Sequence, residues 1–334
     1  MRAAVCREYG PPEVVQVDDD LPAPELGPGQ VRVRVHAAAV NFPDVLLVAD
    51  KYQVTVPPPF VPGSEFAGVV TEVTEVADGA PDAISAVAVG DRVIGTAMVG
   101  AFAEEAVVAA ETVRRIPDGV DERTAAAFGV AHRTAYHVLR SVAALQPGEE
   151  LIVLGAGGGV GLAAVQLGAL LGATVTAVAS SPEKLAVAGA HGATNLVDHR
   201  AGELRPALRA VLPDGGDVVV DPVGGALAEP ALRALRWAGR FVTVGYASGE
   251  IPRIPLNLVL LKGVQVLGFQ FIAFATHAAA EAERNEDELM DLLASGRATP
   301  HIGATFGLDE VAAALRYVAD GRAVGKVVLD LVQN

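Results

Sequence analysis

The sequence contains one cysteine, Cys6, among its 334 residues. A single thiol can form neither an intrachain disulfide nor the cysteine set of a zinc site. Basic residues are also scarce, because 25 Lys and Arg stand against 40 Asp and Glu, giving a formal net charge of -15. Nucleic-acid binding depends on clustered cations, so this balance argues against it. Any anionic ligand must therefore be held by a few local cations and backbone N–H groups.

Long apolar runs are missing as well. The most apolar segments are short and interrupted by Gly, Pro or charged residues, so we expect no transmembrane span. The N-terminal stretch "MRAAVCREYGPPE" lacks the apolar core of a signal peptide. We therefore expect a soluble, cytoplasmic protein that does not act at a membrane. With 51% hydrophobic residues, the chain can bury a sizeable core, and its length favours two domains.

The sequence shows two different patterns of expected secondary structure along its length. From Val31 to about Val108, short β-like runs such as "VRVRVHAAAV" and "DRVIGT" alternate with Pro and Gly clusters, which indicates a mostly β domain. From about Glu122, Ala-rich helical segments alternate with short apolar strands, which we place near residues 151–155, 174–179, 195–197, 217–221, 240–245 and 264–269. This alternation predicts a doubly wound parallel sheet that binds a nucleotide. After Phe271 the chain is expected to return to the first domain, ending in the strand "KVVLDLV".

A glycine-rich turn follows the first strand of the predicted parallel sheet. Residues 151–161 read "LIVLGAGGGVG" and pass directly into a helical segment. First-turn N–H groups of a helix are unpaired and electropositive, so a pyrophosphate fits there if the backbone can be approached closely. We predict a dinucleotide site rather than a merely flexible loop, although alanine takes the first glycine position of the usual fingerprint. The predicted contacts are Ala156, Gly158, Gly159, Val160 and Gly161.

The end of the next strand indicates which dinucleotide is bound. An Asp or Glu there would accept hydrogen bonds from the adenosine ribose of NAD and repel the extra phosphate of NADP. Here "VTAVASSPEK" ends in Ser180 and Ser181 without an acid, so we predict NADPH as the cofactor. Alternatively, Ser181 is a helix N-cap and Lys184 is an ordinary exposed helix lysine. Candidate donors to the 2′-phosphate are Lys184, His199, Arg200 and, if the C-terminal segment folds back, Arg322.

Several stretches carry a resemblance to a known family along nearly the whole chain. They include "AAAVNFPDVLLVADKYQ", "PPFVPGSEFAGVVTEV", "VGDRVIG", "DVVVDPVGG", "GRFVTVGYASG" and "GKVVL". In these the sequence resembles the medium-chain dehydrogenase/reductase superfamily and its zinc-free quinone oxidoreductase branch, which includes zeta-crystallin. The resemblance implies an α/β protein with a GroES-like, mostly β catalytic domain and a Rossmann cofactor domain. We expect residues 1–122 and 271–334 to form the former and residues 123–270 the latter.

The sequence departs from the zinc-dependent alcohol dehydrogenases of that superfamily. Where they carry a cysteine and the triplet Gly-His-Glu, this chain has Asn41 and Gly63-Ser64-Glu65, and the four-cysteine lobe that many of them insert is missing. Asn and Ser cannot supply the thiolate and imidazole ligands that zinc needs, so no metal is predicted. A different site built from His36, Asp44 and Glu65 is a weaker alternative, since His36 fits a half-buried strand residue.

The absence of zinc ligands narrows the predicted reaction. Bound zinc helps an alcohol to react by stabilising its alkoxide, so reversible alcohol oxidation is disfavoured here. A quinone or another α,β-unsaturated carbonyl compound is already electrophilic and mainly needs positioning against the reduced nicotinamide. We therefore predict NADPH-dependent hydride transfer to such a small molecule. Two alternatives stay open: an enoyl thioester reductase of the same superfamily, and an NADPH-binding structural or RNA-binding protein without significant turnover.

The resemblance also implies roles for individual residues. Asn41 is implied to hydrogen-bond the nicotinamide ribose or the substrate, and Asp44 belongs to the same motif unless it only supports the loop. Tyr52 is implied to donate to a carbonyl or to protonate the product, with a packed aromatic as the alternative. The implied cofactor contacts elsewhere are Thr134, Gly245 and Phe269. His132 receives no assignment.

The last predicted strand of the parallel sheet suggests an assembly. Its sequence "GVQVLGFQF" is apolar and contains no charge or proline, so its free edge could pair with another chain. We predict a homodimer through the cofactor domain, with Val264 to Phe269 in the interface. The alternative is that the following helix covers this edge within one chain.

Overall fold

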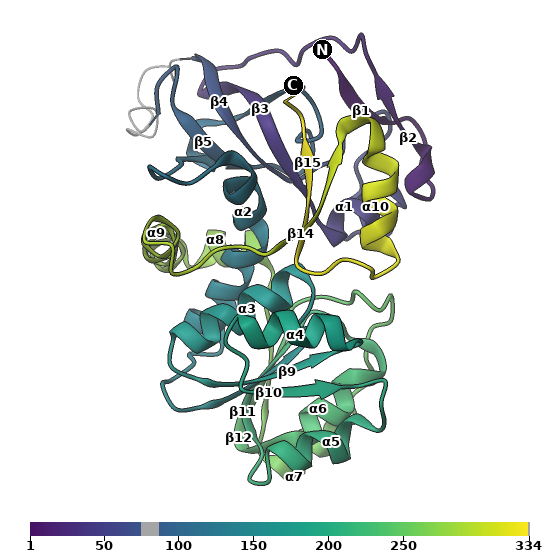
Figure 1. Cartoon of the computed structure of the whole chain (residues 1–334), viewed down its shortest axis with the longest axis vertical. Coiled ribbons are helices and arrows are strands. Elements are labelled where there is room, and N and C mark those ends of the chain that lie inside the picture. The colour runs from purple at the N-terminus through teal and green to yellow at the C-terminus, as the bar shows by residue number, and fades with distance from the viewer. Residues whose placement is uncertain (75–86, 333–334) are drawn as a thin grey trace. The chain divides into compact units, whose positions relative to one another are not determined.

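The computed structural model describes residues 1–74 and 87–332. It divides into two compact units, shown in Figure 1. Unit 1 comprises Met1–Val130 with Thr299–Asn334, and unit 2 comprises Ala131–Ala298. We expected the boundaries after residues 122 and 270, whereas the two units divide after Val130 and after Ala298.

Unit 1 is built on a mostly antiparallel sheet with the strand order β14-β15-β3-β4-β5-β7, and β6 pairs with β3. β3 alternates buried valines with outward arginines, as a strand with one buried face should. Arg32 on the outward face reaches Glu72 and Glu105 on the two flanking strands, at 3.1 and 3.0 Å. The strands are β3 (Gln30–Val40), β4 (Glu65–Val73), β5 (Arg92–Thr96), β6 (Glu105–Ala109), β7 (Val113–Arg115), β14 (Ile302–Gly307) and β15 (Lys326–Asp330).

The C-terminal return of the chain completes unit 1. β15 pairs antiparallel with β3, with Val327 opposite Val40, and parallel with β14. This register brings Lys326, the first residue of β15, to the end of β3 where Asn41 follows. The remaining elements of this unit include the hairpin β1 (Ala3–Cys6) and β2 (Val15–Asp18) and the helices α1 (Phe42–Val48) and α10 (Val311–Ala319).

Unit 2 is a parallel sheet with the strand order β10-β9-β8-β11-β12-β13. This is the order of the doubly wound dinucleotide-binding fold, which confirms the predicted fold class. In Figure 1 α3 and α4 cover one face, and α5, α6 and α7 lie on the other. The strands are β8 (Glu150–Leu154), β9 (Thr174–Ala179), β10 (Asn195–Asp198), β11 (Gly216–Asp221), β12 (Leu235–Thr243) and β13 (Gln265–Gly268). The helices are α3 (Gly159–Leu170), α4 (Pro182–Ala190), α5 (Leu204–Val211), α6 (Ala228–Ala234) and α7 (Leu256–Lys262).

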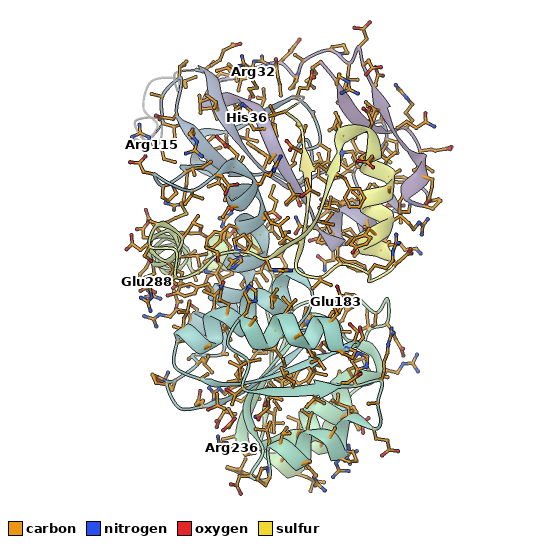
Figure 2. The ribbon with its side chains drawn as sticks, in the orientation of Figure 1. Arg32, His36, Arg115, Glu183, Arg236 and Glu288 are labelled. Atoms are coloured by element: carbon orange, nitrogen blue, oxygen red, sulfur yellow. The ribbon has the colours of Figure 1, made fainter. Side chains whose placement is uncertain are left out.

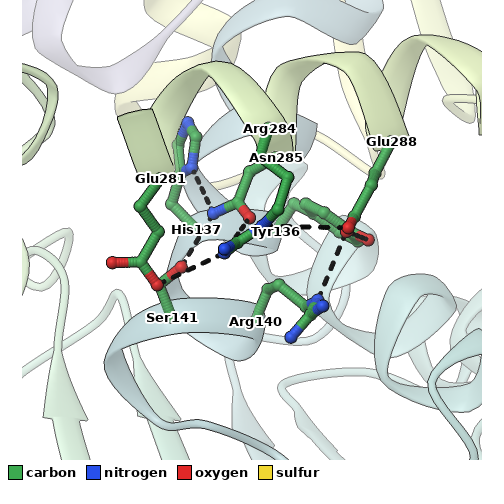
Figure 3. A network of polar contacts seen from close by, with 8 residues as sticks. All are labelled: Tyr136, His137, Arg140, Ser141, Glu281, Arg284, Asn285 and Glu288. Atoms are coloured by element: carbon green, nitrogen blue, oxygen red, sulfur yellow. Dashed lines mark hydrogen bonds and ion pairs between the residues drawn. The ribbon is translucent and has the colours of Figure 1, made fainter. Parts of the chain in front are cut away.

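A polar network fixes α9 (Ala279–Ala294) to unit 2 and explains why the second boundary lies beyond residue 270. Asn285 Nδ2 donates to Ser141 Oγ at 2.8 Å and lies 3.1 Å from His137 Nδ1. The Tyr136 hydroxyl donates to Glu288 at 2.7 Å (Figure 3). The partners lie on α2 (Glu122–His137) and the π-turn after it, while α8 (Phe271–His277) precedes α9. Buried polar groups need such partners, so α9 is held in place by them.

Candidate functional site

The glycine turn of unit 2 has the close packing that the sequence suggested. A Cβ at Gly161 would collide with the carbonyl oxygen of Gly155, so the first turn of α3 can approach the end of β8 only without a side chain. A Cβ at Gly157 would lie 2.5 Å from Cβ of Lys184, whose aliphatic stem covers that glycine. In this turn backbone is therefore packed closely against backbone, and one basic side chain lies across it.

The backbone donors of this turn divide into two groups. The N–H of Ala156 donates to Val178 at 3.0 Å, and that of Gly158 donates to Gly155 at 2.9 Å, so both are used within the protein. Helix geometry provides no acceptor for the N–H groups in the first turn of α3. Among the predicted contacts, the donors available to an anion are therefore those of Gly159, Val160 and Gly161.

The ends of β9 and β10 bring the other predicted cofactor residues together. Ala179 at the end of β9 lies opposite Asp198 at the end of β10, and the His199 N–H donates to the Ala179 carbonyl at 3.1 Å. The residues after the two strands are therefore neighbours at the carboxyl edge of the sheet. These residues are Ser180, Ser181, His199 and Arg200.

Lys184 is more than an ordinary exposed lysine. Its backbone N–H donates to Ser181 Oγ at 3.3 Å, so Ser181 is the N-cap of α4, as the alternative interpretation stated. Yet the side chain of Lys184 is half-buried, and its pKa is lowered by burial first and then by the charge of Arg200. The pKa of His199 is lowered by the same two causes in the same order. Three basic groups thus lie close together, and a bound phosphate would relieve their repulsion.

Gly245 and Phe269 lie at the same carboxyl edge of the sheet, after β12 and β13. The Gly245 N–H points to the Asp221 carbonyl at 3.4 Å, and the Phe269 N–H donates to Thr243 at 3.1 Å. The ring of Phe269 stacks on that of His137, with centroids 6.2 Å apart. Both backbone segments are thereby held in place, and the contact with the nicotinamide amide that the resemblance implies for them stays a prediction.

Three further residues of the sequence analysis have defined surroundings. Thr134 is half-buried on α2, within unit 2. His132 is buried, and its Nε2 lies 3.3 Å from Gln166 Oε1 on α3, which gives it a packing role between the two helices. Arg322 belongs to unit 1, where its guanidinium lies over the ring of Tyr317 at 4.8 Å and 3.8 Å from Asp320.

Unit 1 holds a second group of predicted residues around a buried lysine. Lys326 Nζ donates to Asn41 Oδ1 and to Glu65 Oε1, both at 2.6 Å. Asn41 Nδ2 donates to Glu65 Oε1 at 2.8 Å and to Ser64 Oγ at 3.2 Å. Glu65 Oε2 in turn accepts from the Val130 N–H at 2.6 Å. The exposed fractions of Glu65, Lys326 and Asn41 are 0%, 4% and 7%, so this is a buried and fully connected polar network.

Asp44 lies beside this network and caps α1. Its Oδ2 accepts from the Asn41 N–H at 2.7 Å, so it supports the loop, as one of the two sequence interpretations held. Complete burial raises the pKa of Asp44 to about 7, against the opposing effects of the Asn41 N–H, the Ser64 hydroxyl and Lys326. Buried carboxyl groups whose pKa lies near neutrality are common at functional sites, so Asp44 is consistent with a functional site in unit 1.

Tyr52 lies near Asp44 in the same unit. Burial raises the pKa of its phenol, and the charge of Asp44 raises it further. The phenol therefore stays protonated at neutral pH and can donate a hydrogen bond. A raised pKa makes it a poor source of a proton, which disfavours the second of its two predicted roles.

The residues of unit 1 do not fit a zinc ion. The network contains an amide, a hydroxyl and a carboxylate, with an ammonium group at its centre, whereas zinc binds thiolate, imidazole and carboxylate ligands. Across residues 1–74 and 87–332, no group of three or more His, Cys, Asp or Glu side chains is placed to hold a metal ion. His36 is half-buried on β3 (Figure 2), and its Nδ1 lies 3.8 Å from Glu122. It therefore has the strand role that was expected of it.

The roles of Lys326 and Glu65 were missed in the sequence. A signal for Lys326 was present, because a lysine that opens an otherwise apolar final strand has to find a partner if it is buried. Glu65 gave a similar signal, since it opens a strand whose first four residues are all buried. Their pairing could not be predicted, because 261 residues separate them along the chain.

Unit 2 and unit 1 thus have the architecture of a two-domain, nicotinamide-dependent dehydrogenase or reductase. Comparison with known families agrees: residues 27–118 match the alcohol dehydrogenase GroES-like domain, and residues 159–293 match the family described as zinc-binding dehydrogenase. The chain is 38% identical to quinone oxidoreductase-like protein 2 of Bos taurus, over 99% of this chain and 92% of the relative.

Two further similarities extend this comparison. The quinone oxidoreductase of Thermus thermophilus, solved alone and with NADPH, is 32% identical and superposes with a TM-score of 0.84, covering 99% of this chain and all of that one (100%). A polyketide synthase, GfsB of Streptomyces halstedii, is 37% identical over 91% of this chain, which corresponds to 5% of the synthase. The chain belongs to the medium-chain dehydrogenase/reductase superfamily and is of its quinone oxidoreductase type. Among the described residues, no helix is both long and apolar enough to span a bilayer.

Proposed function

We propose that this protein is a zinc-independent reductase that transfers hydride from NADPH to a quinone or another α,β-unsaturated carbonyl compound. The observation that carries the proposal is the cluster of Lys184, His199 and Arg200 beside a strand end without an acid. These groups are the complement of a 2′-phosphate, which NADPH has and NADH lacks. The neighbouring glycine turn supplies the donors for a pyrophosphate.

The cofactor supplies the hydride from its reduced nicotinamide, and the protein's part is binding and orientation. The first-turn N–H groups of α3 bind the pyrophosphate, and the backbone at Gly245 and Phe269 orients the nicotinamide amide. Thr134 contributes a hydroxyl from α2. In unit 1, Asn41 and Tyr52 supply the hydrogen-bonding groups for the ribose and for the carbonyl of the acceptor. Water is the better source of the proton that completes the reduction, because the raised pKa of Tyr52 disfavours its release.

The absence of suitable zinc ligands limits the reaction class. An alcohol substrate would need a Lewis acid to stabilise its alkoxide, and the Lys326 ammonium cannot coordinate an oxygen as a metal does. It can only donate hydrogen bonds. An acceptor with a conjugated carbonyl group has no such requirement, which supports quinones and enones over alcohols.

An enoyl thioester is the second candidate acceptor. The match to a region of a polyketide synthase favours it, because the family resemblance implies that related enoyl reductase domains share the glycine turn and the absence of zinc. The hydrogen-bonding groups that we propose in unit 1 suit either acceptor, because quinones, enones and enoyl thioesters all contain a carbonyl group conjugated with a carbon–carbon double bond.

The exposed apolar surface of unit 2 supports a homodimer. β13 is the terminal strand of the sheet, and Val266 on it is 45% exposed. Nearby on α7 and β12, Leu260 and Trp237 are 78% and 74% exposed. A strand edge of this kind can pair with its own copy across a two-fold axis, so we place Val264 to Phe269 in the interface.

The proposed function is tested by NADPH oxidation with 1,4-benzoquinone, a simple enone and crotonyl thioester as separate acceptors. Turnover with the first two supports the proposal, and a strong preference for the thioester supports the second candidate. Tight NADPH binding without turnover on any acceptor would favour the structural alternative and contradict the enzymatic one.

A further inference from the structure

Lys326 is a buried cation that the roles described so far do not explain. It is 4% exposed, and its ammonium is bonded to Asn41 and Glu65 at 2.6 Å each. A lysine is rarely buried so completely, because losing the hydration of its charge costs several kcal/mol unless partners replace the water. Glu65 at 0% exposure has the same requirement, so the two residues neutralise each other.

The two charged partners together determine the orientation of the Asn41 amide. An ammonium group has only donors, so the Asn41 atom that faces Lys326 must be Oδ1. A carboxylate has only acceptors, so the atom that faces Glu65 must be Nδ2. Ser64 imposes no orientation by itself, because a hydroxyl can donate or accept. An amide flip would place donor against donor and acceptor against acceptor at two buried contacts.

This orientation decides what Asn41 can offer a ligand. Its Nδ2 group is directed to acceptors of the protein itself: Glu65 at 2.8 Å, Ser64 at 3.2 Å and the Ala39 carbonyl at 3.4 Å. Its Oδ1 accepts one hydrogen bond from Lys326 and keeps a second lone pair. Asn41 is also the most exposed of the four residues Asn41, Asp44, Glu65 and Lys326, at 7%. The group it presents is therefore an acceptor.

We propose that Lys326 is a positioning residue which fixes Asn41 as a hydrogen-bond acceptor for a hydroxyl of the nicotinamide ribose, and not as a donor to the acceptor's carbonyl. The inference rests on the proposed NADPH-dependent function and goes beyond it by assigning the ligand group at Asn41. A ribose hydroxyl can donate, whereas a quinone or enone carbonyl cannot. Donation to that carbonyl is left to Tyr52, whose phenol is protonated at neutral pH.

The test compares two ligands in the Lys326→Met variant. NADPH contains the nicotinamide ribose, and 2′,5′-ADP contains only the adenosine end, so a loss confined to NADPH points to the nicotinamide half. We expect the Kd for NADPH, measured by fluorescence titration, to rise by about 3- to 10-fold, as for one lost hydrogen bond. The Kd for 2′,5′-ADP should stay within about 2-fold of wild type, because its predicted contacts lie in unit 2.

A double-mutant cycle tests whether Lys326 acts through Asn41. In the Asn41→Ala background, Lys326→Met should change the Kd for NADPH by less than about 2-fold, since the group it positions is already gone. Lys326→Met leaves Glu65 buried without its counter-ion and can fail to fold. The Glu65→Gln/Lys326→Met variant removes both charges and also the fixed amide orientation, so it should show the same selective loss of NADPH affinity.

Each outcome of these titrations bears on the proposal separately from the function itself. An unchanged Kd for NADPH in both Lys326 variants would overturn the proposal while leaving the NADPH-dependent function intact. An equal loss for NADPH and 2′,5′-ADP would also overturn it, because that result indicates a general structural role. If the wild-type protein bound neither 2′,5′-ADP nor NADPH measurably, that result would instead contradict the proposed function.

Discussion

Asp44 gives a quantitative prediction about stability and pH. Its carboxyl is fully buried, and its pKa is raised from 3.8 to about 7, mainly by burial. A carboxyl whose pKa is higher in the folded than in the unfolded state makes the folded protein more stable while the carboxyl is protonated. Its contribution is therefore fully present below the unfolded pKa and is lost as the pH rises through the folded pKa. The wild-type protein should lose this contribution progressively between about pH 4 and pH 7.

The perturbation is Asp44→Asn, which keeps the size of the side chain and an oxygen that can accept from the Asn41 N–H. A shift of roughly three pKa units corresponds to about 4 kcal/mol in total at about 1.36 kcal/mol per unit. Between about pH 5 and pH 8, the part of this that is lost is about 2–3 kcal/mol. The amide does not titrate, so the free energy of unfolding of the variant should rise by that amount relative to wild type over this range.

The assay is urea unfolding followed by far-ultraviolet circular dichroism at several pH values, with wild type and variant compared at each. Asp118→Asn is the matched control, because Asp118 is exposed in the same unit and its substitution removes a carboxyl without any burial. The control should show no comparable change with pH. A difference between wild type and Asp44→Asn that stays constant from about pH 5 to pH 8 would refute the reasoning about its burial.

Two further predictions concern the cofactor and the assembly. NADPH should bind more tightly than NADH. Lys184→Ala should weaken NADPH binding about 10-fold, as for one lost charge-assisted hydrogen bond, with little effect on NADH binding. His199→Ala should also reduce the difference in affinity between the two cofactors. Equal wild-type affinities for the two cofactors would contradict this, and the exposed Lys51→Ala is the control. Val266→Pro should convert the dimer to monomers in sedimentation, whereas Val266→Ala should not. Backbone N–H groups alternate along a strand and that of Phe269 points to β12, so that of residue 266 points to the open edge. A dimer that survives the proline with the fold retained, or a wild-type monomer at micromolar concentration, would contradict the proposed interface.

Most of unit 2 could be predicted because its signals are local. The strand–helix alternation, the glycine turn and the missing acid at the end of β9 each lie within a few residues of sequence, and the strand order followed from the fold class. The cluster of Lys184, His199 and Arg200 was foreseen as a set of separate candidates. Their proximity follows from the pairing of β9 with β10, which is itself a general feature of the fold.

The network in unit 1 was only partly predictable. Asn41, Asp44 and Tyr52 came from the resemblance, but the central cation did not, because Lys326 arrives from the C-terminal strand 285 residues away from Asn41. No local pattern specifies that pairing; it depends on the register of β15 against β3. The position of α9 has a similar cause: it lies in unit 2, where its side chains form hydrogen bonds with Tyr136 and Ser141, which are distant in the sequence.

We propose above all that this protein reduces conjugated carbonyl compounds with NADPH and needs no metal to do so. The most direct measurement is NADPH oxidation with 1,4-benzoquinone and a simple enone before and after exhaustive chelation, with elemental analysis of the same sample. We predict unchanged rates after chelation, zinc well below one equivalent per chain, and no oxidation of simple alcohols with NADP. Activity restricted to alcohols, lost on chelation and restored by added zinc, would contradict both the assigned reaction and the role of the buried lysine network.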